Sequence, residues 1–225
     1  MKPPALAIMA KQPIVGKTKT RLCPPLTLAQ SAALYEALLK DTIDLGANLP
    51  DVQLAIAVTP ADGIAYFETI TPPGTVLEPI EGENIGACLN QIHNRLLAQG
   101  HPKVIAINSD GPTLPPEYLQ EAFARLDEVD VVLGPSEDGG YYFIGYTQSH
   151  PGLYEDITWS TFQVTPQTLV RAATLGLSVA QSPPWYDVDT IEDLARLRTE
   201  LATLPAERLP HTRAFLRDHL PTIPE

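Results

Sequence analysis

Short apolar runs separated by longer amphipathic stretches form the basic pattern of this chain. Apolar residues follow one another almost without interruption in these runs, which is typical of strands that are buried on both faces of a sheet. The predicted strands are Ala5–Ala10, Gln53–Val58, Val104–Asn108, Val129–Leu133 and Tyr141–Tyr146. We therefore expect a sheet that is covered by helices on both sides.

Between and after these runs, apolar residues recur at intervals of three and four, which predicts helices. The predicted helices are Leu28–Leu45, Ile85–Leu97, Pro116–Leu126, Pro166–Leu175 and Thr190–Leu201. Alternation of strands and helices predicts an α/β protein, a three-layer α/β/α sandwich with a mainly parallel sheet. A length of 225 residues suits one domain, residues 1–225, in which residues 205–225 form a C-terminal helical tail.

The charged residues are distributed unevenly along the chain. The net charge of −12 disfavours nucleic acid and anionic membranes as partners, because both repel an acidic surface. The first 35 residues are nevertheless basic and contain no acidic residue. No apolar run reaches the roughly 18 residues of a membrane span, and the start of the chain does not resemble a signal peptide. We expect a cytoplasmic protein with reduced cysteines.

The basic residues gather in the loop that follows the first predicted strand. Lys11, Lys17, Lys19 and Arg21 lie there together with Gly16, where the backbone can approach a ligand closely. Four cations within eleven residues suit a compact anion such as a di- or triphosphate. The loop is therefore a candidate phosphate-binding segment.

Two other interpretations of this loop remain open. Gly16-Lys17-Thr18 matches the end of a P-loop, but Lys11 stands where that motif has its first glycine. Pro24-Pro25 would also interrupt the helix into which a P-loop runs. The second alternative is a solvated basic loop without a ligand.

Acidic residues follow two later segments. Asp110 stands directly after a predicted buried strand, where a hard cation bridging two phosphates would be held. Asp187 and Asp189 form a D-x-D, whose side chains point the same way on an extended segment, so that one of them could join Asp110 on a single metal ion. Turn or helix capping by Asp110, and by Thr190 with Asp193, is the alternative.

A further loop contains Asp138 followed by Gly139 and Gly140, and leads into the predicted strand at Tyr141. Paired glycines permit close approach of the backbone to a ligand. The same residues also suit an ordinary hairpin turn.

Taken in order, the basic loop, S-D-x-P-x-L, E-D-G-G-Y-Y, W-S-T and D-V-D-T-x-E-D-L make the chain resemble the GT-A, or nucleotide-diphospho-sugar transferase, superfamily. The similarity covers residues 7 to about 197 and is to a bacterial glycosyltransferase group, and the basic loop is also similar to that of phospholactate guanylyltransferases. Each motif alone is weak, but five in order are fairly specific. The resemblance implies a GT-A fold.

The resemblance also implies roles for individual residues. It makes the four cations of the basic loop and Gly16 nucleotide-binding, with Mg²⁺ or Mn²⁺ held by two aspartates. The metal ligands are Asp110 and Asp189. The catalytic residues are Asp110, Lys17 and Asp138. The acceptor side is formed by Gly139, Gly140, Trp159 and Ser160.

One motif departs from the pattern of the group. Where G-x-D-L-G-x-R-M is usual, the aspartate is replaced by Asn84 and the arginine by Cys88, so a charge pair is missing. We expect nucleotidyl transfer from a nucleoside triphosphate to a small phosphorylated acceptor, because a loop with four cations matches a triphosphate and its departing pyrophosphate. Glycosyl transfer from a nucleotide sugar and non-catalytic binding of a nucleotide or sugar remain the alternatives.

Overall fold

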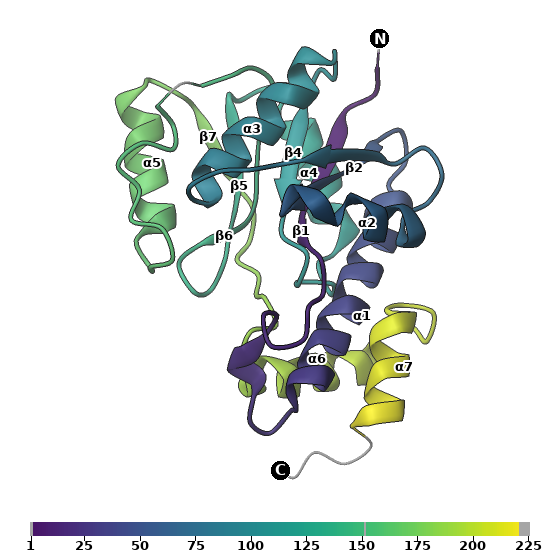
Figure 1. The fold of residues 1–225 in the computed structure, drawn as a ribbon. Helices are drawn as coiled ribbons and strands as arrows, with labels where there is room; N and C mark the ends of the chain where they lie inside the picture. The colour runs from purple at the N-terminus through teal and green to yellow at the C-terminus, as the bar shows by residue number, and fades with distance from the viewer. Residues whose placement is uncertain (1, 151, 221–225) are drawn as a thin grey trace.

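A computed structural model describes residues 2–150 and 152–220 of the chain and shows a mixed sheet between two layers of helices (Figure 1). The strands are β1 (Ala5–Lys11), β2 (Gln53–Thr59), β3 (Val76–Pro79), β4 (Val104–Ile107), β5 (Val131–Pro135), β6 (Tyr141–Tyr146) and β7 (Val179–Gln181). Their order is β3-β2-β1-β4-β6-β5-β7, and β6 runs antiparallel to both of its neighbours. The predicted three-layer α/β/α class with a mainly parallel sheet is confirmed.

The helices are α1 (Leu28–Ala47), α2 (Ile64–Ile70), α3 (Ile85–Ala98), α4 (Pro116–Arg125), α5 (Val164–Thr174), α6 (Ile191–Thr203) and α7 (Pro210–His219). Two short 3₁₀ turns occupy Thr20–Leu22 and Ala61–Gly63. Two helices begin with a capping box, in which the side chains of the N-cap residue and of the third helical residue each accept a hydrogen bond from the other's backbone amide. The pairs are Thr27 and Gln30 in α1, and Thr190 and Asp193 in α6. The predicted capping role of Thr190 and Asp193 is thus confirmed, and the cap turns the chain away from the sheet directly after Asp189.

Side chains of β1 show how the two faces of the sheet are filled. Leu6 and Ile8 pack with apolar residues of α1, α2 and α4, whereas Ala5 and Ala7 point to the opposite face, where α3 and α5 pack. Because successive side chains of a strand alternate between faces, the small alanines lie under α3. Helices thus cover both faces of the central strand.

A third apolar cluster joins α6 and α7 to the outer side of α1, at the lower end of the view in Figure 1. Leu22 and Leu26, from the loop after β1, belong to this cluster. Asp41 of α1 accepts hydrogen bonds from the backbone amides of His211 (3.1 Å) and Thr212 (2.8 Å), so its carboxylate caps the N-terminus of α7. Of the predicted tail, residues 221–225 lie outside the described part of the chain.

Three elements have no counterpart among the predicted ones. These are α2, β3 and β7, which have seven, four and three residues. β3 and β7 form the two edges of the sheet, where strands are half-buried and carry no continuous apolar run. Within the described residues, no helix is both long enough and apolar enough to cross a membrane.

His93 of α3 is buried in the layer between α3 and the sheet. Its ring stacks on Tyr146 at 4.1 Å, and its two nitrogens face the carbonyl oxygens of Leu89 (2.8 Å) and Ile144 (3.1 Å). Burial lowers the pKa of His93 from 6.5 to about 4, although the two carbonyl groups oppose this shift. The ring is therefore neutral at neutral pH.

We expect acid to weaken the fold through His93. Between pH 6.5 and about 4 the unfolded chain binds a proton that the folded chain does not, so the free energy of unfolding falls as the pH is lowered through this range. The contribution is on the order of 3 kcal/mol, from about 1.4 kcal/mol for each pH unit between the two pKa values. Urea unfolding at several pH values should show a flatter dependence for His93→Gln than for the wild type. Parallel curves for the two proteins would contradict this assignment.

Candidate functional site

Asp110 lies where the central strand β4 leaves the sheet at its carboxyl end. The segment that carries Asp187 and Asp189 runs beside it, and the amide of Val188 donates a hydrogen bond of 3.0 Å to the carbonyl oxygen of Asp110. Val188 is buried in the third apolar cluster, so its two aspartate neighbours turn the other way, as alternation in an extended segment requires. The backbone therefore brings together two acidic motifs that are distant in sequence.

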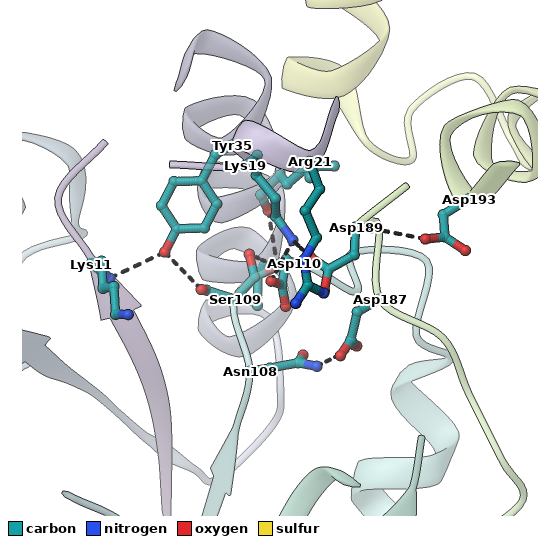
Figure 2. Close-up of polar contacts among 12 residues, drawn as sticks. Lys11, Lys19, Arg21, Tyr35, Asn108, Ser109, Asp110, Asp187, Asp189 and Asp193 are labelled. Carbon is teal, nitrogen blue, oxygen red and sulfur yellow. Dashed lines mark hydrogen bonds and ion pairs between the residues drawn. The ribbon is translucent and has the colours of Figure 1, made fainter. Parts of the chain in front are cut away.

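Lys19 lies between the two predicted metal ligands (Figure 2). Its Nζ is 2.6 Å from Oδ2 of Asp110 and 2.5 Å from Oδ1 of Asp189, and only 6% of its side chain is exposed. A single metal ion could not bind both carboxylates if they were more than roughly 8 Å apart. Two carboxylates that contact the same ammonium are well within that distance. Burial disfavours the charged form of Lys19, but the attraction of both carboxylates outweighs burial and raises its pKa. Lys19 is therefore a permanent cation of this cluster.

Asp187 adds a third carboxyl group to the same place. Burial raises its pKa well above the ordinary range, and the negative charge of Asp110 acts in the same direction, while Lys19 opposes them. The side-chain amide of Asn108 donates a hydrogen bond to Oδ1 of Asp187. Oδ1 of Asp110 is buried and has no hydrogen-bond partner among the described residues. The cluster thus contains more acidic groups than one ammonium neutralises, and a buried oxygen that is ready to accept a ligand.

The basic loop extends from this cluster toward solvent. Arg21 is 78% exposed and its Nη1 lies 3.8 Å from Oδ2 of Asp189. Lys17 is also exposed, and the chain reverses at Gly16, whose φ of +79° is in the left-handed region that glycine favours. Lys11 lies apart from the carboxylates, at the end of β1. Of the four predicted phosphate-binding cations, the structure therefore brings only Lys19 and Arg21 to the acidic cluster.

A buried tyrosine links the end of β1 to the loop that carries Asp110. The hydroxyl of Tyr35, from α1, accepts a hydrogen bond from the amide of Lys11 (3.1 Å) and lies 2.8 Å from Oγ of Ser109 (Figure 2). Burial raises the pKa of Tyr35, so the hydroxyl keeps its proton. This contact holds the two strand ends in a fixed relation.

The loop with Asp138 runs beside Trp185, two residues before Asp187, and the charge of Asp138 adds to that of Asp110 in raising the pKa of Asp187. Asp138 is exposed and accepts a hydrogen bond of 2.9 Å from the amide of Gly140. Gly139 has a φ of +91°, and a Cβ at this position would overlap the backbone of Phe162. The predicted turn is therefore packed tightly against the segment that follows Trp159.

Trp159 itself lies on the N-terminal turn of α3. A Cβ added to Gly86 would clash with the indole ring, so the glycine makes the room that the ring occupies. Trp159 is half-buried and its neighbour Ser160 is exposed with a φ of 62°. The predicted acceptor-side residues thus take part in two close contacts, Gly139 on Phe162 and Trp159 on Gly86, and their role in binding an acceptor remains a prediction.

The two positions that depart from the pattern of the group, Asn84 and Cys88, lie on either side of Gly86 in the sequence. Asn84 is the N-cap of α3 and accepts a hydrogen bond of 3.0 Å from the amide of Ala87, a role that aspartate would also fill. Cys88 is 7% exposed and belongs to the core under α3. Both replacements therefore preserve the local structure, while the positive charge of an arginine at position 88 is lost.

Another group with the spacing of a metal site is formed by Asp41, Asp44 and His211, whose ligand atoms lie within 4.8 Å of one another. Both oxygens of Asp41 already accept amide hydrogen bonds from α7, and Nε2 of His211 lies 3.4 Å from Asp44. These contacts dock α7 on α1. The group therefore has a structural role between two helices, and it is separate from the cluster of Asp110, Asp187 and Asp189.

Sequence reasoning gave no separate role to four residues of the cluster. They are Tyr35, Asn108, Ser109 and Asp187. A signal was present only for Asp187, since it is the first aspartate of the D-x-D, and for Asn108, which is the first polar residue after a buried strand. Nothing in the sequence indicates that Tyr35, in the middle of an amphipathic helix, reaches Ser109.

Comparison with known proteins agrees with this geometry. Residues 42–161, just over half of the chain, match the family DUF2064, described as an uncharacterized protein conserved in bacteria. No curated protein matches the chain. A structure from Desulfovibrio desulfuricans G20, a candidate nucleotide-diphospho-sugar transferase by name, is 29% identical with a TM-score of 0.89, covering 97% of this chain and 95% of its own.

More distant structures share the fold. A 4-diphosphocytidyl-2C-methyl-D-erythritol synthase from Anaerococcus prevotii DSM 20548 is 11% identical, with a TM-score of 0.60 and coverage of 89% of this chain and 97% of its own. The manganese complex of Rv0371c from Mycobacterium tuberculosis H37Rv is 17% identical, with a TM-score of 0.53 and coverage of 87% and 97%. The predicted superfamily is therefore confirmed, and the chain has the fold of nucleotidyl- and sugar-transferases.

Proposed function

This chain belongs to the bacterial family DUF2064, and from that premise we propose that it is a metal-dependent transferase that uses a nucleotide donor. The observation that carries the proposal is the cluster of Asp110, Asp187 and Asp189 at the carboxyl edge of the sheet, beside an exposed basic loop. Acidic groups that hold a cation and basic groups that hold phosphate are the two requirements of phosphoryl chemistry. The reaction favoured is nucleotidyl transfer from a nucleoside triphosphate to a small phosphorylated acceptor.

The residues present fit a divalent metal ion. Carboxylate oxygens are the ligands that Mg²⁺ and Mn²⁺ prefer, and Oδ1 of Asp110 is a buried oxygen without a partner among the described residues. Asp110 and Asp189 would hold the ion, with Asp187 completing the acidic set. Such an ion, when bound, neutralises phosphate charge and thereby favours departure of the leaving group. Mg²⁺ and Mn²⁺ are both compatible with this ligand set.

The chain's own residues would position and neutralise the substrates. In nucleotidyl transfer a phosphate oxygen of the acceptor attacks the α-phosphorus of the triphosphate, and pyrophosphate leaves. Lys11, Lys17 and Arg21 would bind the phosphates, and Lys17 would stabilise the charge of the leaving pyrophosphate. Asp138, whose charge acts on Asp187 of the same cluster, would serve as the general base for an acceptor hydroxyl if the reaction is glycosyl transfer instead.

Glycosyl transfer from a nucleotide sugar is the second candidate. It is favoured by the similarity to the Desulfovibrio desulfuricans protein, which its name assigns to the nucleotide-diphospho-sugar transferases. In this reaction the nucleoside diphosphate of the donor would be the leaving group. The same carboxylates would hold the metal ion that neutralises its charge. Trp159, which packs on Gly86, would contact the acceptor in either reaction.

The third possibility was a non-catalytic binding protein, which the replacements at Asn84 and Cys88 suggested. Asn84 retains the helix cap, and Cys88 lies in the core. All three carboxyl groups of the cluster and the basic loop are present. The structure therefore gives the catalytic interpretation more support than the non-catalytic one.

Two assays separate these possibilities. Release of pyrophosphate from each nucleoside triphosphate, measured with Mg²⁺ or Mn²⁺ and a panel of small phosphorylated acceptors, would support nucleotidyl transfer. Turnover of nucleotide sugars without pyrophosphate release would support glycosyl transfer instead. Binding of a nucleotide, shown by calorimetry, without turnover in either assay would make the protein a binding module and would refute the proposed transferase.

Removing a cation of the basic loop should weaken nucleotide binding without unfolding the protein. Lys17→Ala and Arg21→Ala each remove an exposed side chain, so the fold should be preserved. Each should lower affinity about 10-fold or more, because a charge-assisted hydrogen bond contributes about 1.5–3 kcal/mol. Calorimetric titration measures this, and Lys2→Ala, which lies before β1, is the matched control. Equal affinity in all three variants would favour the solvated-loop interpretation.

A further inference from the structure

We propose that Lys19 is the resident cation of the acidic cluster, which a divalent metal ion must displace, and that the displaced ammonium binds a phosphate of the nucleotide. This inference rests on the proposed function and adds a form of regulation to it. Metal and nucleotide would then bind cooperatively, because each supplies the charge that the other needs. A metal ion alone would bind weakly to the protein.

Lys19 and a metal ion would compete for the same carboxylate oxygen atoms. Its ammonium lies 2.6 Å from Asp110 and 2.5 Å from Asp189, which are the two carboxylates best placed to hold an ion. A cation at either carboxylate would lie within a few ångströms of the ammonium, and repulsion between the two is strong in a buried site. The two occupants therefore exclude each other.

The ammonium of Lys19 does not balance the charge of the acidic cluster. Lys19 supplies one positive charge to a cluster with three carboxyl groups, and Oδ1 of Asp110 remains without a partner among the described residues. A divalent ion would balance this cluster better than one ammonium, so the carboxylates themselves favour the exchange.

Moving Lys19 away from the two carboxylates costs free energy. Only 6% of its side chain is exposed, so an ammonium that leaves both carboxylates loses two close ion pairs in a largely buried place. Its backbone is held in the left-handed region, with a φ of 51°, which is unfavourable for an L-residue. The ion pairs offset this strain in the resting state. An incoming metal ion alone offers the displaced ammonium no new partner.

A polyphosphate does offer such a partner. Lys19 belongs to the loop that also presents Lys17 and Arg21 to solvent, and Arg21 lies 3.8 Å from Asp189. Phosphate oxygens bound by this loop would be within reach of the ammonium as it leaves the carboxylates, and they bind ammonium groups strongly. The nucleotide therefore supplies the negative charge that lets the metal ion enter.

The experiment measures Mn²⁺ binding in the absence of nucleotide, by electron paramagnetic resonance of the free ion. Lys19→Gln removes the competing cation and should bind Mn²⁺ at least about 10-fold more tightly than the wild type, since a shift of 1.4 kcal/mol is tenfold in affinity. Lys17→Gln removes the same charge from the same loop without touching the carboxylates, and should bind Mn²⁺ almost as weakly as the wild type. Equal or weaker Mn²⁺ binding by Lys19→Gln would overturn the proposal.

A second measurement keeps the test valid if Lys19→Gln does not fold without metal. In the wild type, the rise in Tm with Mn²⁺ and an imido-triphosphate nucleotide together should exceed the sum of the two separate rises. If the rise in Tm with both ligands equals the sum of the two separate rises for every imido-triphosphate nucleotide tested, the coupling between metal and nucleotide is refuted. Folding of Lys19→Gln only with Mn²⁺ present would support the exchange, because metal then replaces the missing ammonium.

The Mn²⁺ titration distinguishes this inference from the proposed function. Tighter Mn²⁺ binding by Lys19→Gln, together with no turnover of any nucleotide, would reject the transferase and keep Lys19 as the resident cation. Turnover with unchanged Mn²⁺ affinity in that variant would keep the transferase and reject the exchange.

Discussion

Asp110→Asn should retain the fold and lose nearly all metal-dependent turnover. The amide has the shape of the carboxylate but not its charge, so the metal ion would lose an anionic ligand. The atom affected is Oδ1 of Asp110, which is buried and has no hydrogen-bond partner among the described residues. The turnover number should fall by more than about 100-fold, because replacement of a mere supporting partner of a metal ligand already costs 10–100-fold. Steady-state kinetics at saturating Mg²⁺ or Mn²⁺ measure the effect, and circular dichroism verifies the fold.

Asp44→Asn is the matched control for this result. Asp44 belongs to the other group with metal-site spacing, with Asp41 and His211, and its side chain is half-exposed. Its replacement should leave turnover within about twofold of the wild type, as is usual for exposed positions away from the reacting atoms. Normal turnover in Asp110→Asn with loss in Asp44→Asn would move the metal site to α1 and α7.

Gly139→Ala should damage both stability and activity. A Cβ at this position overlaps the backbone of Phe162, which cannot rotate away as a side chain could, and the φ of +91° is unfavourable for alanine. We expect the free energy of unfolding to fall by about 2–4 kcal/mol, from backbone strain and overpacking combined. Because the loop carries Asp138, turnover should fall as well. Urea unfolding and kinetics measure the two effects.

Gly140→Ala provides the comparison. Its Cβ would lie 3.2 Å from Oδ1 of Asp138 in its own turn, a contact that a side chain can relieve, and Gly140 does not have a positive φ. The loss of stability should therefore be below about 1 kcal/mol. Similar losses for the two glycines would show that close packing against Phe162 does not control this loop.

The sequence by itself determined the layers of this protein. Short apolar runs such as Val104–Ile107 are typical of strands covered on both faces, and intervals of three and four in Leu28–Leu45 indicate a helix with one buried side. These patterns reflect burial, which acts on each segment locally. The short edge strands β3 and β7 and the helix α2 escaped prediction because their neighbours stabilise them more than their own sequence does.

The chemical groups of the site were also visible in the sequence, since polar residues directly after buried strands lie at the ligand-bearing edge of the sheet. Their mutual arrangement was not. Lys19 was expected to face phosphate, yet it lies between Asp110 and Asp189, and Tyr35 reaches Ser109 from a different layer. Pairing across the sheet and docking of α6 and α7 on α1 bring these residues together, and both depend on contacts between segments far apart in the chain. The order of residues specifies which groups are available, whereas the energy of a buried ion pair depends on distance and burial, which only the tertiary structure sets.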